Sequence, residues 1–204
     1  MKTSRLEAFS DGVLAIIITI MVLELKTPEG HDFAALRHTT GTALLSYLLS
    51  FVYVGIYWNN HHHMFQLVGR ISGSVLWANL GLLFCLSLFP FTTAWMDETD
   101  FARTPVVAYG VNLLAAAVAY FVLQSLIIHG EGGDSPLRRA VGRDLKGKGS
   151  VVLYLAGIAA ALVIDRGGRV GIWVGIGFFV AVALMWVIPD RRIDRAVREH
   201  GATE

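Results

Sequence analysis

Residues 5–25 read RLEAFSDGVLAIIITIMVLEL, a largely apolar run long enough to form a membrane-spanning helix. An α-helix needs about 20 predominantly apolar residues to cross the hydrocarbon core of a bilayer. The chain contains six such candidate spans: residues 5–25, 41–65, 71–96, 105–129, 150–165 and 169–188. The fifth is the shortest, so it is expected to extend into its flanking residues or to thin the bilayer. We therefore expect an all-α, polytopic membrane protein in which residues 1–204 form a single domain of six transmembrane helices.

The composition excludes several other classes of protein. Hydrophobic residues make up 54% of the chain and charged residues 16%, against about 25% charged residues in an ordinary soluble domain. The chain is too apolar to be disordered, and its single cysteine, Cys85, excludes a disulfide framework within the chain. A formal net charge of +1 does not indicate nucleic-acid binding. The first span is not typical of a cleavable signal peptide, because Asp11 and Glu24 interrupt it and no small-residue cleavage site follows.

The distribution of basic residues predicts the orientation of the spans. Six spans place both termini on one side of the membrane, and the side whose short loops are richer in Lys and Arg is cytoplasmic. The side of the termini has twelve basic residues and the opposite side has five. The first group is Lys2, Arg5, Arg70, Arg138, Arg139, Arg143, Lys146, Lys148, Arg191, Arg192, Arg195 and Arg198; the second is Lys26, Arg37, Arg103, Arg166 and Arg169. We therefore expect a multi-pass protein of the cell membrane with both termini in the cytoplasm.

The first span presents two different faces when its residues are placed on a helical wheel. One face is an aliphatic stripe about 60° to either side of Ile16. Its members are Gly12, Ile16, Thr19, Ile20 and Leu23. Ser10 and Asp11 lie more than about 100° away from Ile16, near the cytoplasmic end of the span. Ile17 is expected to face lipid.

Polar groups on the next two spans are candidate partners for Asp11. An ionisable group within a span costs about 2.5–3.5 kcal/mol on insertion scales and is a candidate functional residue. The indole of Trp58, the imidazole of His61 and the amide of Asn79 lie toward the same side of the membrane and are able to donate to a carboxylate. Such a network either fastens three helices together or contacts an ion directly, and the sequence leaves both interpretations open.

Other notable residues have structural explanations. The run His61–His63 does not converge on one metal ion, because adjacent helical residues point about 100° apart. No metal site is expected, and no enzymatic activity either, since the chain has no G-x-S-x-G or P-loop sequence. Gly171 and Gly175 form a G-x-x-x-G pair that predicts close helix packing. Pro90 predicts a kink in the third span.

A motif at the start of the first span is typical of a known family. Arg5-x-x-x-Phe9-Ser10-Asp11 resembles the R-x-x-x-F-S-D signature of the lysosomal potassium-channel family (transmembrane protein 175) and its prokaryotic homologues. Further similarity lies in residues 16–21, Trp58-x-x-His61, residues 65–68, Asn79 and Phe89-Pro90. These motifs all lie in the first half of the chain, and beyond them the resemblance is mainly one of hydropathy.

This resemblance implies a cation channel that selects potassium over sodium without a conventional selectivity-filter loop. Family members with one six-helix repeat look like homotetramers whose first helices line the pore. The expected partners are therefore further copies of the chain, the lipid bilayer and the permeant potassium ion, and no cofactor is expected. Ile16 matches the family's constricting isoleucine, and Ile20 and Leu23 lie one and two turns further along the same stripe.

The sequence allows two interpretations for each of two residues in the first span, Thr19 and Arg5. The hydroxyl of Thr19 either contacts the ion beside the constriction or bonds to its own helix backbone. Arg5 lies near the aliphatic stripe, where a bare cation would repel potassium. It is therefore expected to pair with Glu7 or Asp11, or to turn away from the stripe.

Two other functions compete with a channel. A secondary transporter usually has internal repeats and broken helices near the middle of the membrane. Here the first three and last three spans share no visible similarity, and the first span has no Pro or Gly pair at its centre. A structural or accessory membrane protein is the other alternative, and the plain later spans favour it.

Overall fold

The residues that the structure describes form eight helices. The computed structural model describes residues 3–69, 71–132, 135–142, 144–165 and 167–187. The helices are α1 (Thr3–Leu23), α2 (Phe33–Gln66), α3 (Gly73–Ser87), α4 (Phe89–Glu98), α5 (Arg103–Glu131), α6 (Pro136–Val141), α7 (Leu145–Val163) and α8 (Val170–Val187). No strand occurs within these described ranges, and the expected all-α class is confirmed.

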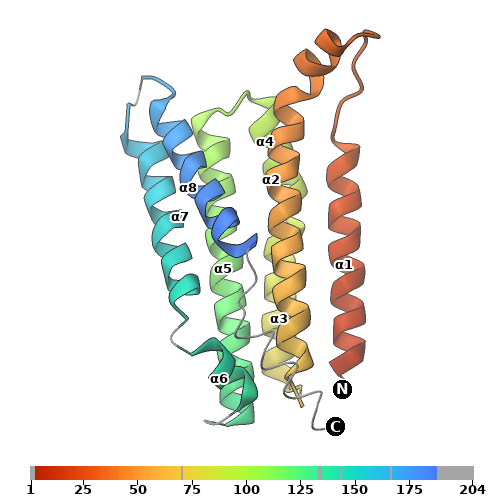
Figure 1. Cartoon of the computed structure of the whole chain (residues 1–204), viewed down its shortest axis with the longest axis vertical. Helices are drawn as coiled ribbons and strands as arrows, with labels where there is room; N and C mark the ends of the chain where they lie inside the picture. The colour runs from red at the N-terminus through yellow and green to blue at the C-terminus, as the bar shows by residue number, and fades with distance from the viewer. Residues whose placement is uncertain (1–2, 70, 133–134, 143, 166, 188–204) are drawn as a thin grey trace.

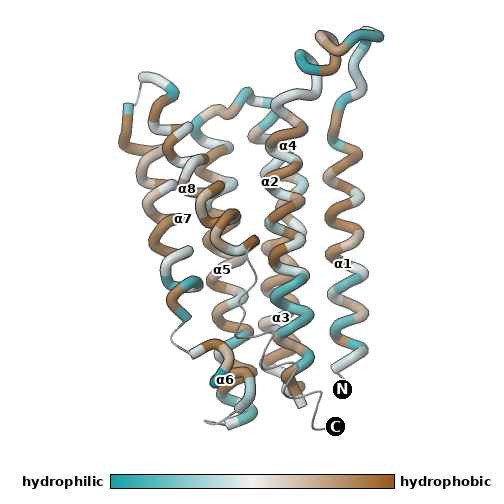
Figure 2. The backbone as a smooth tube through the Cα atoms, in the orientation of Figure 1, coloured by the Kyte–Doolittle hydropathy of each residue, from teal (hydrophilic) through white to brown (hydrophobic). Residues whose placement is uncertain are grey.

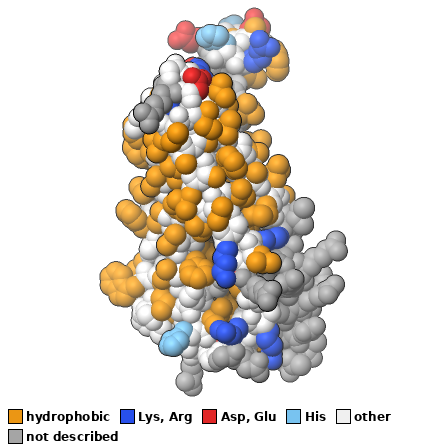
Figure 3. Space-filling model, turned by 90° about the vertical axis from the view of Figure 1, so that its left-hand side faces the viewer, with side chains coloured by type: hydrophobic (Ala, Val, Ile, Leu, Met, Phe, Trp, Pro, Cys, Tyr) orange, Lys and Arg blue, Asp and Glu red, His pale blue; other side chains and the backbone are white. Residues whose placement is uncertain are grey.

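Six segments of the described chain are long and apolar enough to cross a membrane, with α3 and α4 together forming one of them. Figure 1 shows the long helices side by side, with α1 at one edge of the bundle and α7 at the other. Figure 3 shows hydrophobic side chains over the middle of the α7 side of the molecule and charged side chains toward its ends. The expectation of six transmembrane helices is therefore confirmed.

The connections alternate between the two ends of the bundle. The α1–α2, α4–α5 and α7–α8 connections lie at the upper end in Figure 1, whereas the start of α1, the α2–α3 connection and α6 lie at the lower end. This is the up-and-down arrangement that consecutive membrane spans adopt. Of the basic residues assigned to loops, Lys2, Arg70, Arg143, Arg166 and those from 191 to 198 lie outside the described residues.

Two helices begin at least five residues earlier than the hydropathy of the sequence predicts. α2 starts at Phe33 rather than at residue 41, and the Asp32 carboxylate accepts a hydrogen bond from Ala35 N at 2.8 Å. At 1.5 Å per residue α2 is about 50 Å long, which exceeds the hydrocarbon core of about 30 Å. α7 starts at Leu145 rather than at residue 150, where Asp144 caps it through Gly147 N at 3.0 Å. Polar capping residues lengthen a helix beyond its apolar run, so hydropathy alone misplaces its start.

The third span is broken near its middle, as Pro90 predicts. α3 ends at Ser87, Leu88 connects the two segments, and α4 begins at Phe89 with Pro90 in its first turn. Proline has no backbone N–H, so it is tolerated in a first turn but not in a helix interior. The Thr92 hydroxyl donates to the Leu88 carbonyl at 3.0 Å and so supplies a donor to the backbone at the break.

Backbone contact holds α7 against α8. A Cβ atom added at Gly175 would lie 2.7 Å from the Gly157 carbonyl oxygen, and one at Gly157 would lie 2.7 Å from the Phe179 ring. Lipid tails are as apolar as side chains, so close van der Waals packing rather than the hydrophobic effect drives helix association in a membrane. The G-x-x-x-G pair is therefore a packing motif, as expected.

Arginine side chains tie the helices together at the upper end. Arg103 at the start of α5 donates to the carbonyl oxygens of Ala161 at 2.7 Å and Asp165 at 2.9 Å, and so caps the end of α7. Arg169 binds the Asp100 carboxylate at 2.8 Å. That hydrogen bond and its charge hold the pKa of the Asp100 carboxyl below its usual range. The loops at this end are thus joined by specific polar contacts.

Candidate functional site

α1 keeps one apolar face uncovered by the rest of the chain. We call this face the α1 stripe; its members are Gly12, Ile16, Thr19, Ile20 and Leu23, all exposed. Ile16 is 59% exposed and Leu23 is 80% exposed. A Cβ atom added at Gly12 would meet no atom within 4 Å. In a membrane such a face contacts lipid, another protein chain or the water of a pore.

The opposite side of α1 packs into the bundle. Leu14, Ile17 and Met21 are buried against the neighbouring helices, and Ile17 is only 3% exposed. The expectation that Ile17 faces lipid is therefore wrong. The wheel gives the angle between two residues of one helix, but it does not say which direction is occupied by the other helices.

The Thr19 hydroxyl is bonded within its own helix. Its Oγ1 donates to the Ile16 carbonyl oxygen at 2.9 Å. This is the backbone contact that Ser and Thr commonly make inside helices. The hydroxyl proton is thereby directed along the helix, and the acceptor lone pairs of Oγ1 stay available on the exposed face.

A continuous chain of hydrogen bonds joins the lower ends of α1, α2 and α3. His61 Nε2 donates to Asn79 Oδ1 at 2.8 Å, Asn79 Nδ2 donates to Ser10 Oγ at 3.0 Å, and Ser10 Oγ donates to the Leu6 carbonyl oxygen at 2.9 Å. We call Ser10, His61 and Asn79 the buried polar triad; Ser10 and Asn79 are fully buried and His61 nearly so. Figure 2 shows the polar lower ends of α1 and α2 that contribute to it. Since each donor has an acceptor, the triad fastens three helices with no buried group left unpaired.

Asp11 has a smaller network than the sequence led us to expect. It accepts a hydrogen bond from Trp58 Nε1 at 3.1 Å, at an exposed position. The amide of Asn79, expected as a donor to Asp11, instead donates to the neighbouring Ser10. The reason is geometric: Ser10 points into the bundle, whereas Asp11 is one residue, or about 100°, further around α1.

Arg5 and Phe9 lie on the exposed side of α1. Phe9 is among the exposed large apolar side chains, and Arg5 is exposed as well. Within the described part of the chain Arg5 forms no ion pair, and Glu7 lies beside His62 instead, with 3.9 Å between Oε1 and Nδ1. Arg5 was expected either to pair with an acidic residue or to turn away from the stripe. In the single chain it is exposed and unpaired with an acid among the described residues.

The three consecutive histidines contact different partners. His61 bonds to Asn79, His62 Nε2 lies 2.8 Å from Gln66 Nε2, and His63 Nδ1 donates to the Asn59 carbonyl oxygen at 2.8 Å. Within the described ranges no group of three or more His, Cys, Asp or Glu side chains is arranged to hold a metal ion.

A second polar cluster, not predicted from the sequence, lies deep in the bundle. Ser50 Oγ lies 2.7 Å from Thr93 Oγ1 and 3.0 Å from the Tyr109 hydroxyl, and the Tyr53 hydroxyl donates to the Phe179 carbonyl oxygen at 2.6 Å. These bonds link α2 to α4, α5 and α8. A signal was present, because the polar residues of α2 recur every three or four positions on one face: Ser46, Ser50, Tyr53, Tyr57 and His61, all buried.

We predict that Asn79→Leu destabilises the protein much more than Asp11→Ala. Leucine has the same branched shape as asparagine, although it is larger, and it leaves Ser10 and His61 without partners, at about 1–3 kcal/mol for each buried group. Asp11→Ala removes one exposed hydrogen bond, worth about 1 kcal/mol. Thermal melting followed by fluorescence-detected size exclusion tests the order of the two effects. Equal melting temperatures for the two variants would contradict it.

Comparison with known families connects this geometry to characterised proteins. Residues 5–90 match the family described as "Endosomal/lysosomal potassium channel TMEM175". The matched region contains α1, α2, α3 and the break before α4, and hence the α1 stripe and the buried polar triad.

Individual relatives extend the similarity over the whole chain. A protein named as a potassium channel from Chryseobacterium sp. (strain P1-3) is 50% identical over 98% of this chain and 100% of its own length. One of the same description from Streptomyces collinus is 33% identical over 60% of this chain and 63% of its own. Among solved structures, the crystal structure of a lysosomal potassium-selective channel TMEM175 homolog from Chamaesiphon minutus superposes with a TM-score of 0.63 and 28% identity. It covers 92% of this chain and 97% of that one.

Proposed function

The chain belongs to the TMEM175 family, and from that membership we propose that it is a potassium-selective cation channel of the cell membrane. The observation that supports the proposal most directly is the α1 stripe, which is apolar, continuous and uncovered by the chain's own helices. In this proposal α1 helices from several copies of the chain surround a common axis, and the stripe faces that axis.

A single copy has no enclosed path along the α1 stripe, so the proposal needs an oligomer. α1 contacts α2, α3 and α4 and lies at an edge of the bundle (Figure 1). A homotetramer, the assembly implied by the resemblance, brings four such edges together and closes the space between them. A cyclic assembly also repeats one interface between neighbours, which is the usual way for a membrane pore to form from identical chains.

Ile16 forms the constriction in this assembly, and Ile20 and Leu23 continue the apolar wall. A ring of aliphatic side chains controls ion flow through its wetting, because an ion passes only when the neck is wide enough to hold water. A narrow neck of this kind favours potassium over the smaller sodium ion, which loses its hydration shell at a higher free-energy cost. The lone pairs of Thr19 Oγ1 lie on the same face and offer the neck an oxygen ligand.

The buried polar triad and Asp11 support the pore helix in this proposal rather than contacting the ion. The triad anchors the face of α1 opposite the stripe to α2 and α3. The hydrogen bond from Trp58 to Asp11 fixes the rotation of α1 about its axis at the same end. Arg5 and Phe9, exposed in the single chain, then lie where neighbouring copies meet.

The proposed orientation places the lower end of Figure 1 in the cytoplasm. Arg138, Arg139, Lys146 and Lys148 lie in or next to α6 and the start of α7, at that end. They belong to the group of twelve basic residues that the sequence assigns to this side, against five on the other, and that excess follows the positive-inside rule. Both termini are then cytoplasmic.

Ion flux through the purified protein tests the proposed function. In a planar bilayer with potassium on one side and sodium on the other, we expect a current without any coupled ion and a reversal potential displaced toward the potassium equilibrium potential. A secondary transporter would instead show flux that depends on a coupled ion, and an accessory protein would show none. Either of these two results would contradict the proposal.

A further inference from the structure

A cavity lies inside the single chain, away from α1. It has a volume of about 290 Å³ and is lined by residues of α2, α5, α6, α7 and α8, at the end of the bundle where α7 begins. Its volume is near the lower end of the range for ligand pockets, about 300–1,000 Å³. No residue of α1 lines it, so it is separate from the proposed pore.

The cavity has an aromatic and aliphatic wall. Ile56, Ala117, Val151 and Tyr154 contribute to it, together with Phe121, which is partly exposed on the outer surface of α5. The cavity is not fully closed by the chain. Such a wall suits a hydrocarbon chain entering from the bilayer.

Two polar side chains in the wall lack partners among the described residues. Gln124 is 7% exposed and Tyr57 is 8% exposed, and neither forms a hydrogen bond with another described side chain or backbone group. Buried polar groups in proteins are nearly always paired, because leaving one unpaired is costly. Within the described ranges only Glu131 Oε2 is fully buried without a partner, so the polar atoms of Gln124 and Tyr57 stay accessible and are free to contact a molecule bound in the cavity.

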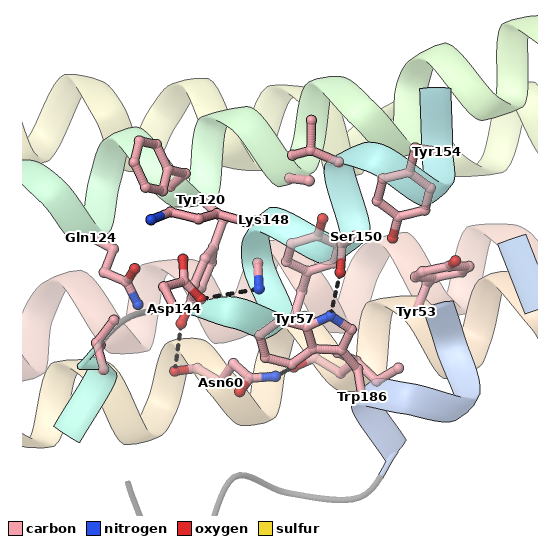
Figure 4. Close-up of a pocket in the computed structure, with 16 residues that line it drawn as sticks. Tyr53, Tyr57, Asn60, Tyr120, Gln124, Asp144, Lys148, Ser150, Tyr154 and Trp186 are labelled. Carbon is pink, nitrogen blue, oxygen red and sulfur yellow. Dashed lines mark hydrogen bonds between the residues drawn. The ribbon is translucent and has the colours of Figure 1, made fainter. Parts of the chain in front are cut away.

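One acidic and one basic side chain lie at the same end of the cavity. Figure 4 shows Asp144, Lys148 and Gln124 together at one end, and Tyr53 and Tyr154 at the other. Asp144 precedes α7 and Lys148 is in its first turn, so both groups lie where the helix enters the apolar layer. A bound headgroup would therefore meet one negative and one positive group at the depth of the membrane interface.

Trp186 also lines the cavity and lies beside Ser150 and Tyr57 (Figure 4). Its Nε1 donates to Ser150 Oγ at 2.8 Å, and the Lys146 ammonium lies 5.6 Å from the centre of its ring. Tryptophan concentrates at the membrane–water interface, where its ring is apolar and its N–H is polar. The indole is thus held in place as a rigid part of the cavity wall.

We propose that this cavity binds one phospholipid with a primary-amine headgroup, a phosphatidylethanolamine. Its ammonium pairs with Asp144, its phosphate pairs with Lys148, and part of one acyl chain fills the aromatic cavity. The volume holds about ten groups of the size of a water molecule, which matches a segment of one chain and not a whole lipid. The polar atoms of Gln124 and Tyr57 face the ester region of the lipid.

The headgroup charges distinguish this lipid from others in the membrane. A phosphatidylglycerol has no ammonium for Asp144. A phosphatidylcholine carries a quaternary ammonium that donates no hydrogen bond to the carboxylate. Charge-assisted hydrogen bonds are stronger than those between neutral groups. The hydrogen bond from the primary amine to Asp144 is therefore expected to account for most of the preference.

Native mass spectrometry of the purified full-length protein with added dioleoyl phosphatidylethanolamine, phosphatidylcholine or phosphatidylglycerol tests the proposal. We expect one retained phosphatidylethanolamine per chain and a preference over the other two lipids of roughly tenfold, as one charge-assisted hydrogen bond predicts. Equal retention of the three lipids by the unmodified protein would overturn the proposal.

Substitutions in the cavity and at its charged end locate the bound lipid. Val151→Trp fills the cavity and is expected to abolish retention, whereas Val152→Trp, the neighbouring exposed position on α7, leaves it unchanged. Asp144→Asn keeps a good helix cap and is expected to remove the preference for phosphatidylethanolamine over phosphatidylcholine. Lys148→Gln, at an exposed site, weakens retention of all three lipids. Retention by Val151→Trp equal to that of Val152→Trp, or an unchanged preference in Asp144→Asn, would contradict the assignment.

Discussion

Replacing Ile16 by Asn is expected to increase the current and to bring the potassium and sodium permeabilities close to each other. If four copies of Ile16 form the neck of the pore, four amides wet it and remove the dewetting barrier. Sodium then passes with much of its hydration shell intact, so the advantage of potassium is lost. Reversal potentials measured under a potassium–sodium gradient report the change directly.

Leu155→Asn is the matched control for this experiment. Leu155 is an exposed aliphatic residue of α7, on the side of the bundle opposite α1 (Figure 1). The substitution places the same amide on an exposed apolar surface, where it costs insertion free energy and lowers expression without changing selectivity. Ile17 is unsuitable as a control because it is buried within the chain. An unchanged reversal potential for Ile16→Asn would exclude Ile16 from the pore wall.

Replacing Gly175 by Leu is expected to prevent the stable association of α7 with α8. A Cβ atom there would lie 2.7 Å from the Gly157 carbonyl oxygen. This contact involves the backbone, so no side-chain rotation relieves it and the helices have to separate. Overpacking of a well-packed core costs about 1–3 kcal/mol and sometimes more, and we expect a value at or above the upper end. Loss of the monodisperse peak in size exclusion, or a large fall in melting temperature, measures the effect.

Gly177→Leu provides the comparison on the same helix. Gly177 is exposed, and a Cβ atom there would meet nothing within 4 Å. The same substitution two residues away therefore adds the same volume and the same helix propensity without a clash. If both variants melt at the same temperature, close backbone contact is not what holds this hairpin together.

The number and approximate position of the spans follow from the sequence because the bilayer imposes a length on every apolar run. The exact starts of α2 and α7 do not, since they depend on the caps Asp32 and Asp144 in polar segments with no hydropathy signal. Pro90 is different: its missing N–H is a local covalent property, and the break at Leu88 could be predicted from it.

The separation of the exposed and buried faces of α1 was predictable from the sequence, but not all of the contacts that these faces make. The wheel correctly separates Ile16 from Ser10, because both angles belong to one helix. It does not determine which of the adjacent residues Ser10 and Asp11 meets Asn79, since that depends on the rotation of α1 against α3. The same limitation made Ile17 look lipid-facing, although it is buried.

The cavity and the deep polar cluster depend on contacts between distant parts of the chain. Ser50 meets Tyr109, and Tyr57 shares a cavity wall with Trp186, although more than fifty residues separate the members of each pair. A single sequence contains no information about such pairs beyond the polar periodicity of α2. Hydroxyl groups in a span indicate a buried face, but they do not indicate its neighbours.

The cap that Arg103 provides for α7 bears on the order in which the protein is made. A chain is synthesised from its amino terminus, and its earlier part folds first, so α5 and its guanidinium are present before α7 emerges. α7 is among the least apolar of the spans, and the carbonyl groups at its end need donors that lipid does not provide. Arg103 supplies those donors, and α5 supplies Gly110, where Phe179 of α8 packs closely. The α7–α8 hairpin therefore inserts into the membrane against α5, which is already in place. A circular permutation that moves α7 and α8 to the front of the gene removes this support.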